Sequence, residues 1–195
     1  MSILGYTVSE SVYFAPLDWL AIGDTCFKEL RLNCEPTVFA MQQLLWNIAH
    51  DNRSHVDVLK RILPIFQRAI DEELEVRKSL RNFGVNRWQQ QSQRQTADGA
   101  KKRRQTSASN SDDEDIECEV CRATLCFSRV ECQARVWCLL HALEKIKERS
   151  RLAQQSTVIF DHDDDELSQA LRRVQDTIRM KSARRMAAHQ RNATL

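Results

Sequence analysis

The spacing of apolar residues changes from period two to a helical period near Pro16. Between Tyr6 and Phe14 apolar and polar residues alternate, which predicts a short β segment within residues 1–14. A strand of this length is not stable alone, and the rest of the chain offers little β-like sequence. We therefore expect an orphan β segment that lacks a partner strand.

Residues 15–88 show apolar positions at helical spacing and predict a helical domain of three helices with its own core. Pro36 suits the first turn of the second helix. The third helix is long and ends at Gly84. Pro64 lies inside it and is expected to kink or split it, because proline removes a backbone donor and its ring crowds the preceding turn.

Residues 89–117 are polar, with a single aliphatic residue larger than alanine, and predict a disordered linker. Its basic run, Lys101–Arg104, fits either a nuclear localisation patch or an ordinary solvated linker. Residues 149–195 contain a brief β-like run at 157–160 and then predict a C-terminal helical region with a basic tail. That helix end could contact phosphates or simply be a solvated face.

Composition favours a mainly α fold: 42% of residues are hydrophobic, and the chain has only four glycines and three prolines. We expect a helical bundle unit, a small single-zinc finger and C-terminal helices, with the orphan β segment at the N-terminus. The formal net charge of +2 says little about partners. No apolar run approaches the ~20 residues that a membrane helix needs, so no membrane partner is expected.

Five of the seven cysteines lie between Cys118 and His141. Cys118 with Cys121, and Cys138 with His141, form two short-spaced ligand pairs separated by a loop, which is the pattern of a structural zinc site. We predict one Zn²⁺ on these four side chains, in a finger spanning residues 118–148. Cys132 is an alternative fourth ligand in place of His141. A closed four-ligand site leaves no position for a reactive water, which argues against a hydrolytic zinc enzyme.

The segment GYTVSESVYFAPLDWLAIGDTC resembles the end of the Jumonji catalytic domain in the histone demethylases that combine Jumonji, ARID and PHD modules. The zinc stretch falls where that family carries a finger of five Cys, one His and two more Cys. The helical unit, the finger and the start of the last helix follow in the family's order, so the resemblance covers roughly residues 5–180, and it is specific at 5–26 and in the finger. The matching positions of the first segment are Gly5, Tyr6, Glu10, Val12, Phe14, Asp18, Trp19, Leu20 and Gly23.

The resemblance implies a chain without the catalytic centre. The family binds Fe²⁺ through a His-x-Asp/Glu pair and a later His, all upstream of the segment matched by Gly5, and no histidine here matches those ligands. Neither Fe(II) nor 2-oxoglutarate is therefore expected, and this chain is not expected to be an enzyme. The family finger holds two zincs, but its last two Cys positions are Ile146 and Glu148 here, so a degenerate finger with one zinc is expected.

The resemblance, together with the zinc pattern, predicts a non-catalytic, nuclear, zinc-binding interaction module associated with chromatin. Its expected partners are chromatin or nuclear proteins, with nucleic acid reached through the basic linker and the C-terminal helix. No small-molecule substrate is expected. The alternative is an incomplete fragment of an active Fe(II)/2-oxoglutarate-dependent histone H3 lysine demethylase that acts in transcription regulation.

Overall fold

The computed structural model describes residues 3–8, 11–16, 20–37, 40–91 and 116–193 of the 195-residue chain. The fold is mainly α-helical, as the sequence predicted. The chain divides into two compact units, and the division falls inside helices α1 (Leu20–Leu32) and α3 (Val56–Asn82). Unit 1 comprises Met1–Phe27, Met41–Glu72 and Asp164–Leu195, and unit 2 comprises Lys28–Ala40 and Glu73–Asp163.

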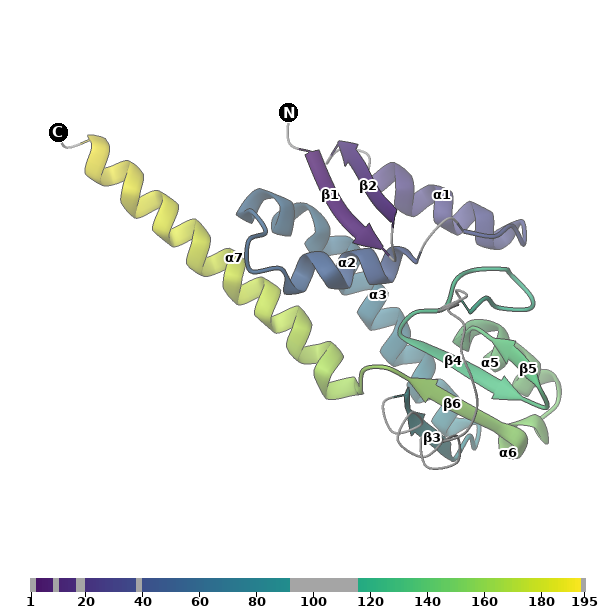
Figure 1. The fold of residues 1–195 in the computed structure, drawn as a ribbon. Helices are drawn as coiled ribbons and strands as arrows, with labels where there is room; N and C mark the ends of the chain where they lie inside the picture. The colour runs from purple at the N-terminus through teal and green to yellow at the C-terminus, as the bar shows by residue number, and fades with distance from the viewer. Residues whose placement is uncertain (1–2, 9–10, 17–19, 38–39, 92–115, 194–195) are drawn as a thin grey trace, which may run out of the picture. The chain divides into compact units, whose positions relative to one another are not determined.

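In unit 1 the N-terminal segment forms a β-hairpin rather than an orphan strand (Figure 1). Strand β1 (Ile3–Val8) pairs antiparallel with β2 (Ser11–Pro16). The expectation of a missing partner was wrong, because the alternating segment is long enough to fold back and satisfy one edge of each strand by itself. Helix α2 lies against β1, which supplies the further packing that an isolated hairpin needs.

The helices of unit 1 pack through apolar residues three or four positions apart, as one-sided helices do. Besides α2 (Met41–His50) and the first part of α3, the unit contains the long α7 (Asp164–Ala193). Acidic residues occupy the first turn of α7, where they complement the helix dipole. The buried apolar residues are Leu45 and Ile48 of α2, Val56, Leu59, Ile62, Phe66 and Ile70 of α3, and Leu167, Ala170 and Val174 of α7.

The expectation for Pro36 was wrong, and of the two alternatives for Pro64 the structure excludes the split. Helix α2 begins at Met41, not near Pro36. The neighbouring Thr37 instead hydrogen-bonds Thr124, with 3.1 Å between the two hydroxyl oxygens, and both residues belong to unit 2. Helix α3 is not split at Pro64 and runs unbroken from Val56 to Asn82. Pro64 is exposed, so water can satisfy the carbonyl that lacks its helical donor.

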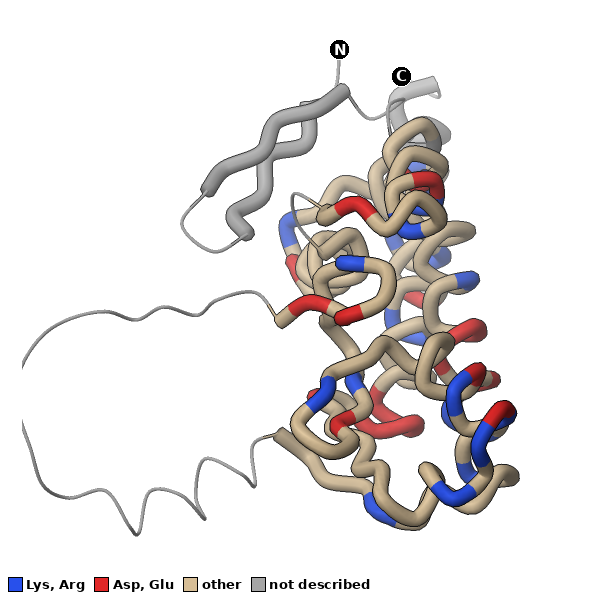
Figure 2. Tube along the Cα trace, turned by 90° about the vertical axis from the view of Figure 1, so that its right-hand side faces the viewer, with Lys and Arg blue, Asp and Glu red and all other residues tan. Residues whose placement is uncertain are grey.

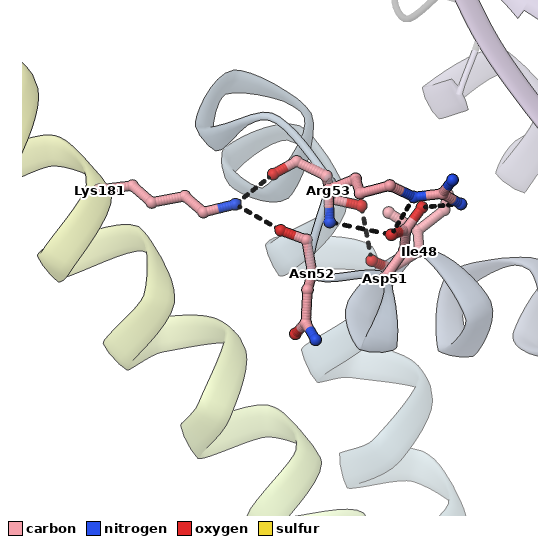
Figure 3. Close-up of polar contacts among 6 residues, drawn as sticks. Ile48, Asp51, Asn52, Arg53 and Lys181 are labelled. Atoms are coloured by element: carbon pink, nitrogen blue, oxygen red, sulfur yellow. Dashed lines mark hydrogen bonds and ion pairs between the residues drawn. The ribbon is translucent and has the colours of Figure 1, made fainter.

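A lysine of α7 fastens that helix to the turn between α2 and α3, within unit 1 (Figure 3). Lys181 Nζ donates hydrogen bonds to the backbone carbonyls of Asn52, at 3.2 Å, and Ser54, at 2.6 Å. The Ser54 hydroxyl in turn donates to the carbonyl of Ile48, at 2.9 Å. The Ser54 bond satisfies a carbonyl in the last turn of α2, and the Lys181 bonds satisfy two carbonyls of the turn that follows it.

Unit 2 contains a four-stranded sheet that the sequence only partly predicted (Figure 1). Its strands are β3 (Arg87–Gln90), β4 (Ser128–Cys132), β5 (Arg135–Trp137) and β6 (Ser156–Phe160), in the order β3-β6-β4-β5. Strand β3 runs parallel to β6, and the other pairs are antiparallel. Of these strands, only the β-like run at 157–160 was expected.

The predicted linker begins and ends in β structure. Gln89 and Gln90 belong to β3, and Glu117 forms an isolated bridge with Thr124. The basic run Lys101–Arg104 lies outside the described residues. The two open interpretations of that run, a localisation patch or a solvated linker, therefore stay predictions.

The end of α3 is set by Gly84, as predicted. Its φ of +89° is a left-handed conformation that costs glycine little. The Gly84 N–H donates to the carbonyl of Arg81, and the Val85 N–H donates to that of Leu80, which together form a Schellman motif. Leu80 and Val85 are both buried in the same apolar cluster, so the chain reversal places the following strand over the core of unit 2.

A buried arginine joins α3 to the sheet inside unit 2. Arg77 Nε lies 3.0 Å from a carboxylate oxygen of Glu73, and the guanidinium also donates to the Ser128 hydroxyl and to the His162 carbonyl. The Ser128 hydroxyl donates to the same carboxylate. Only 1% of the Arg77 side chain is exposed, and a charge buried to this degree requires such a complete set of partners.

Acidic residues fill the first turn of α7, and the later turns are richer in arginine and lysine (Figure 2). Arg185 pairs with Asp57 of α3 across 3.2 Å, and Arg179 pairs with Asp176 on its own helix. Some of the basic face is thus matched by carboxylates in unit 1. In the parts of the chain that the structure describes, no helix is long and apolar enough to cross a membrane.

Candidate metal centre

The first ligand pair lies in a tight turn that precedes β4. The Arg122 N–H donates to the carbonyl of Cys118 at 2.8 Å, and Arg122 adopts a left-handed conformation with φ of 59°. The Cys118 N–H in turn donates to the carbonyl of Ala123 at 3.0 Å. This closed turn brings Cys118 and Cys121 to one side of the backbone. An ion pair between Arg122 and Glu117, at 2.9 Å, braces the turn from outside.

The second pair lies at the start of helix α5 (Leu139–Glu148). Cys138 is the N-cap residue, with extended backbone angles, and its carbonyl accepts the first helical hydrogen bond from Ala142 at 3.0 Å. His141 follows in the first turn, and residues three apart on a helix lie on the same face. The helix start therefore points Cys138 and His141 in one direction and offers its positive dipole end to the cysteine sulfur.

The structure brings the four predicted side chains together. One donor atom from each of Cys118, Cys121, Cys138 and His141 lies within 4.8 Å of all the others. His141 Nδ1 is 3.1 Å from Cys138 Sγ and 3.6 Å from Cys118 Sγ. Zinc bond lengths give tetrahedron edges of about 3.5 to 3.8 Å between such donors. The donor set and its spacing therefore fit one tetrahedral Zn²⁺, with His141 presenting Nδ1.

The cysteines of this group are buried in the apolar cluster of unit 2, while His141 reaches the surface. Nε2 of His141 lies 4.0 Å from Glu144, too far for a hydrogen bond. The carboxylate of Glu131, in β4 of the same finger, pairs with Arg129 at 3.1 Å.

Without a metal ion, the three cysteine side chains form hydrogen bonds with one another. Hydrogen bonds from Cys121 and then Cys138 lower the pKa of the Cys118 thiol well below its usual range. Hydrogen bonds with Cys118 and Cys121 raise the pKa of the Cys138 thiol. A metal ion that binds all three sulfurs displaces the protons that they carry.

Arg31 is a neighbour of the site that sequence reasoning missed. Its Nη2 lies 3.7 Å from Cys138 Sγ, although the two residues are 107 positions apart. Burial opposes the charge of this guanidinium, but the negative charge of Cys138 and then of Cys121 outweighs it and raises the pKa of Arg31. A single arginine near the end of a predicted helix carries no sequence signal that would point to this contact.

The remaining cysteines lie elsewhere. Cys132 is in β4, opposite Arg135 of β5 and Ser156 of β6, and is not a member of the ligand group. Burial raises the pKa of the Cys126 thiol, which makes it a poor thiolate ligand. Cys26 and Cys34 are exposed. All seven cysteines lie in the described residues, and none forms a disulfide.

The positions of the last two family cysteines are occupied in a different way. Ile146 is fully buried in the apolar cluster, and Glu148 lies at the surface near Lys145, at 3.5 Å. Within the described residues, the group at Cys118, Cys121, Cys138 and His141 is the single cluster of His, Cys and acidic side chains with metal-like spacing.

Comparison with known proteins agrees with this geometry. Residues 118–170 match the model of the C5HC2 zinc finger family. The chain is also 27% identical over 172 residues to Protein Jumonji of Gallus gallus. That alignment covers 84% of this chain but 14% of the relative, so the chain spans about a seventh of that protein's length. The chain thus carries a zinc-binding finger region of the C5HC2 type that resembles the corresponding part of a Jumonji protein.

Proposed function

We propose that Cys118, Cys121, Cys138 and His141 hold one structural Zn²⁺ that fixes the core of unit 2. The observation that carries this proposal is the convergence of four donor atoms within 4.8 Å of one another, with His141 Nδ1 facing two sulfurs. Three thiolates and one imidazole complete a tetrahedron and leave no open position. The metal in this proposal supplies stability to the fold.

Zinc content and ligand identity can be tested on the purified full chain. We expect about one equivalent of zinc, removed only by strong chelators. Changing Cys118 to Ser is expected to release the metal, whereas Cys34→Ser, at an exposed cysteine outside the site, is expected to keep it. Equal zinc content in both variants would refute the assignment. Incorporation of two equivalents in the wild type would refute the single site.

We further propose that the chain is a non-catalytic interaction module of the nucleus that binds chromatin. The support is its likeness to a Jumonji protein, together with the excess of basic residues in the later turns of α7. An exposed basic helix can bind phosphates, and binding of this kind weakens steeply with salt. Chromatin proteins or nucleosomal DNA are the partners that such a surface suits.

Binding to purified mononucleosomes tests the chromatin part. A complex is expected at low salt, and it should weaken when Arg179 and Arg184 in the later turns of α7 are both changed to Gln. A matched variant, Lys60→Gln with Arg61→Gln on α3, removes the same charge and should bind like the wild type. Equal binding by both variants would count against the α7 surface. No binding to nucleosomes by the wild type would count against the chromatin role itself.

The alternative is that this chain is one part of an active Fe(II)- and 2-oxoglutarate-dependent histone H3 lysine demethylase. The observation that favours it is the coverage of the relative, since the chain matches a small share of a much longer protein. Demethylation of a trimethyl-lysine H3 peptide by the chain alone, or by a longer product of the same gene, separates the two proposals. Activity in the longer product alone would support the alternative, and activity in neither would support the non-catalytic module.

A further inference from the structure

Arg31 is the charged side chain that approaches the cysteine cluster from outside the finger. It lies in the part of α1 that belongs to unit 2, one residue before the helix end. Its Nη2 donates to Cys138 Sγ across 3.7 Å. The side chain is half-buried, so this contact is only partly screened by water.

Zinc changes the charge that Arg31 faces. Three thiolates and a neutral imidazole around Zn²⁺ carry a net charge of roughly −1. This charge lies within the apolar cluster of unit 2, where an unbalanced ion is costly. A guanidinium that donates to one of the ligand sulfurs offsets this charge and holds the sulfur in place, as outer-shell donors do at other metal sites.

The same segment makes a second contact with the finger. The Thr37 and Thr124 hydroxyls are 3.1 Å apart, and the Thr124 N–H donates to the Thr37 hydroxyl at 3.2 Å. Thr124 follows the turn that carries Cys118 and Cys121. Between the two contact points, Cys34 adopts a left-handed φ of 57°, and the Glu35 N–H donates to the carbonyl of Leu30, which closes the end of α1.

We propose that Arg31 is an outer-shell donor to the zinc site and that it couples zinc binding to the docking of residues 28–37 on the finger. The inference rests on the proposed zinc site. Coupling of this kind is reciprocal: any factor by which the Arg31 contact tightens zinc binding is also the factor by which zinc tightens the docked segment. Residues 28–37 are therefore held most firmly when the metal is bound.

Zinc release from the purified full chain into a chromogenic chelator tests the first half. Arg31→Met keeps the aliphatic stem and is expected to release zinc about tenfold faster than wild type. Arg31→Lys keeps the charge but not the planar donor group, and it is expected to release zinc about threefold faster than wild type. Arg135→Met removes the same charge from an exposed position on β5 of the finger and is expected to stay within about twofold of wild type.

Hydrogen exchange of the backbone amides of Asn33, Cys34 and Glu35 tests the second half, because these amides close the end of α1. Removing zinc from the wild type should speed their exchange, and Arg31→Met should show the faster exchange even with zinc bound. Amide exchange rates that are the same with and without zinc, and the same in Arg31→Met as in wild type, would overturn the coupling.

The outcomes distinguish this inference from the zinc assignment on which it rests. A folded wild type without zinc would defeat the assignment. A zinc-loaded wild type whose release rate is the same in Arg31→Met would defeat only the role of Arg31. If Arg31→Met does not fold, Arg31→Lys decides: faster release supports the role, and release at the wild-type rate overturns it.

Discussion

Sγ of Cys138 lies 3.1 Å from Nδ1 of His141, its neighbour in the first turn of α5. A helix start gives this spacing to a Cys-x-x-His pair without strain, because the cap residue and the third helical residue share a face. Cys132, the alternative fourth ligand, is instead committed to the middle of the sheet of unit 2.

The first prediction separates His141 from Cys132. Losing one of four zinc ligands costs on the order of 3 kcal/mol, or about 100-fold in affinity, so His141→Ala should lose its zinc to a moderate chelator. Cys132→Ala should keep zinc at the wild-type affinity. Competition titrations with a zinc indicator measure both. The assignment of His141 fails if the two variants exchange behaviours.

The second prediction concerns Ile146, where the resemblance to the Jumonji-type finger led us to expect the position of a cysteine. Ile146 is fully buried and packs in the apolar cluster, so Ile146→Ala should destabilise the zinc-loaded chain by about 2 to 5 kcal/mol in urea unfolding. Zinc stoichiometry should not change. Leu140→Ala on the same helix, at a side chain 45% exposed, should cost less than about 1 kcal/mol. Zinc loss in Ile146→Ala would show that packing at this position is needed to hold the metal site together, contrary to the expectation.

The third prediction concerns the buried ion pair of unit 2. Replacing Arg77 with Met leaves the Glu73 carboxylate without its guanidinium partner and should cost about 3 to 5 kcal/mol in the free energy of unfolding. Adding Glu73→Gln to that variant should recover part of the loss, because the orphaned charge is removed. Arg149→Met, at an exposed position, serves as the control. Losses that simply add in the double variant would contradict a coupled pair.

The fourth prediction concerns the turn between β4 and β5. Gln133 and Ala134 both adopt left-handed φ values, 51° and 63°, which disfavour residues with a Cβ. The double change Gln133→Asn and Ala134→Gly should therefore stabilise unit 2 by about 1 kcal/mol. Gly84→Ala, at a φ of +89° with no atom near the added Cβ, should destabilise by a similar amount. Thermal unfolding of both variants checks the opposite signs.

That turn also explains why the sheet of unit 2 was hard to foresee. Two-residue hairpin turns are usually predicted from Asn-Gly or a related pair of residues, and Gln133-Ala134 is not such a pair. The sequence did not predict strand β3, because Arg87–Gln90 is mostly polar and is continuous with the glutamine-rich sequence that follows. Its partner strand, β6, lies about 70 residues further along the chain, and local sequence does not predict pairing at such a separation.

Features that depend on local spacing could be predicted. The ligand pairs at Cys118 and Cys138, the glycine that ends α3 and the acidic start of α7 each follow from residue types a few positions apart. Features that depend on distant contacts could not. Arg31 beside Cys138, and Thr37 beside Thr124, join segments about a hundred residues apart, and the second of these contacts accompanies the late start of α2.

X-ray absorption at the zinc edge of the purified full chain tests the central claim most directly. The expected result is one zinc per chain in a shell of about three sulfurs at about 2.3 Å and one nitrogen at about 2.0 Å. That shell should be lost in His141→Ala and kept in Cys132→Ala. A folded chain without zinc, a second equivalent of zinc, or a shell of four sulfurs would contradict a single Cys₃His site.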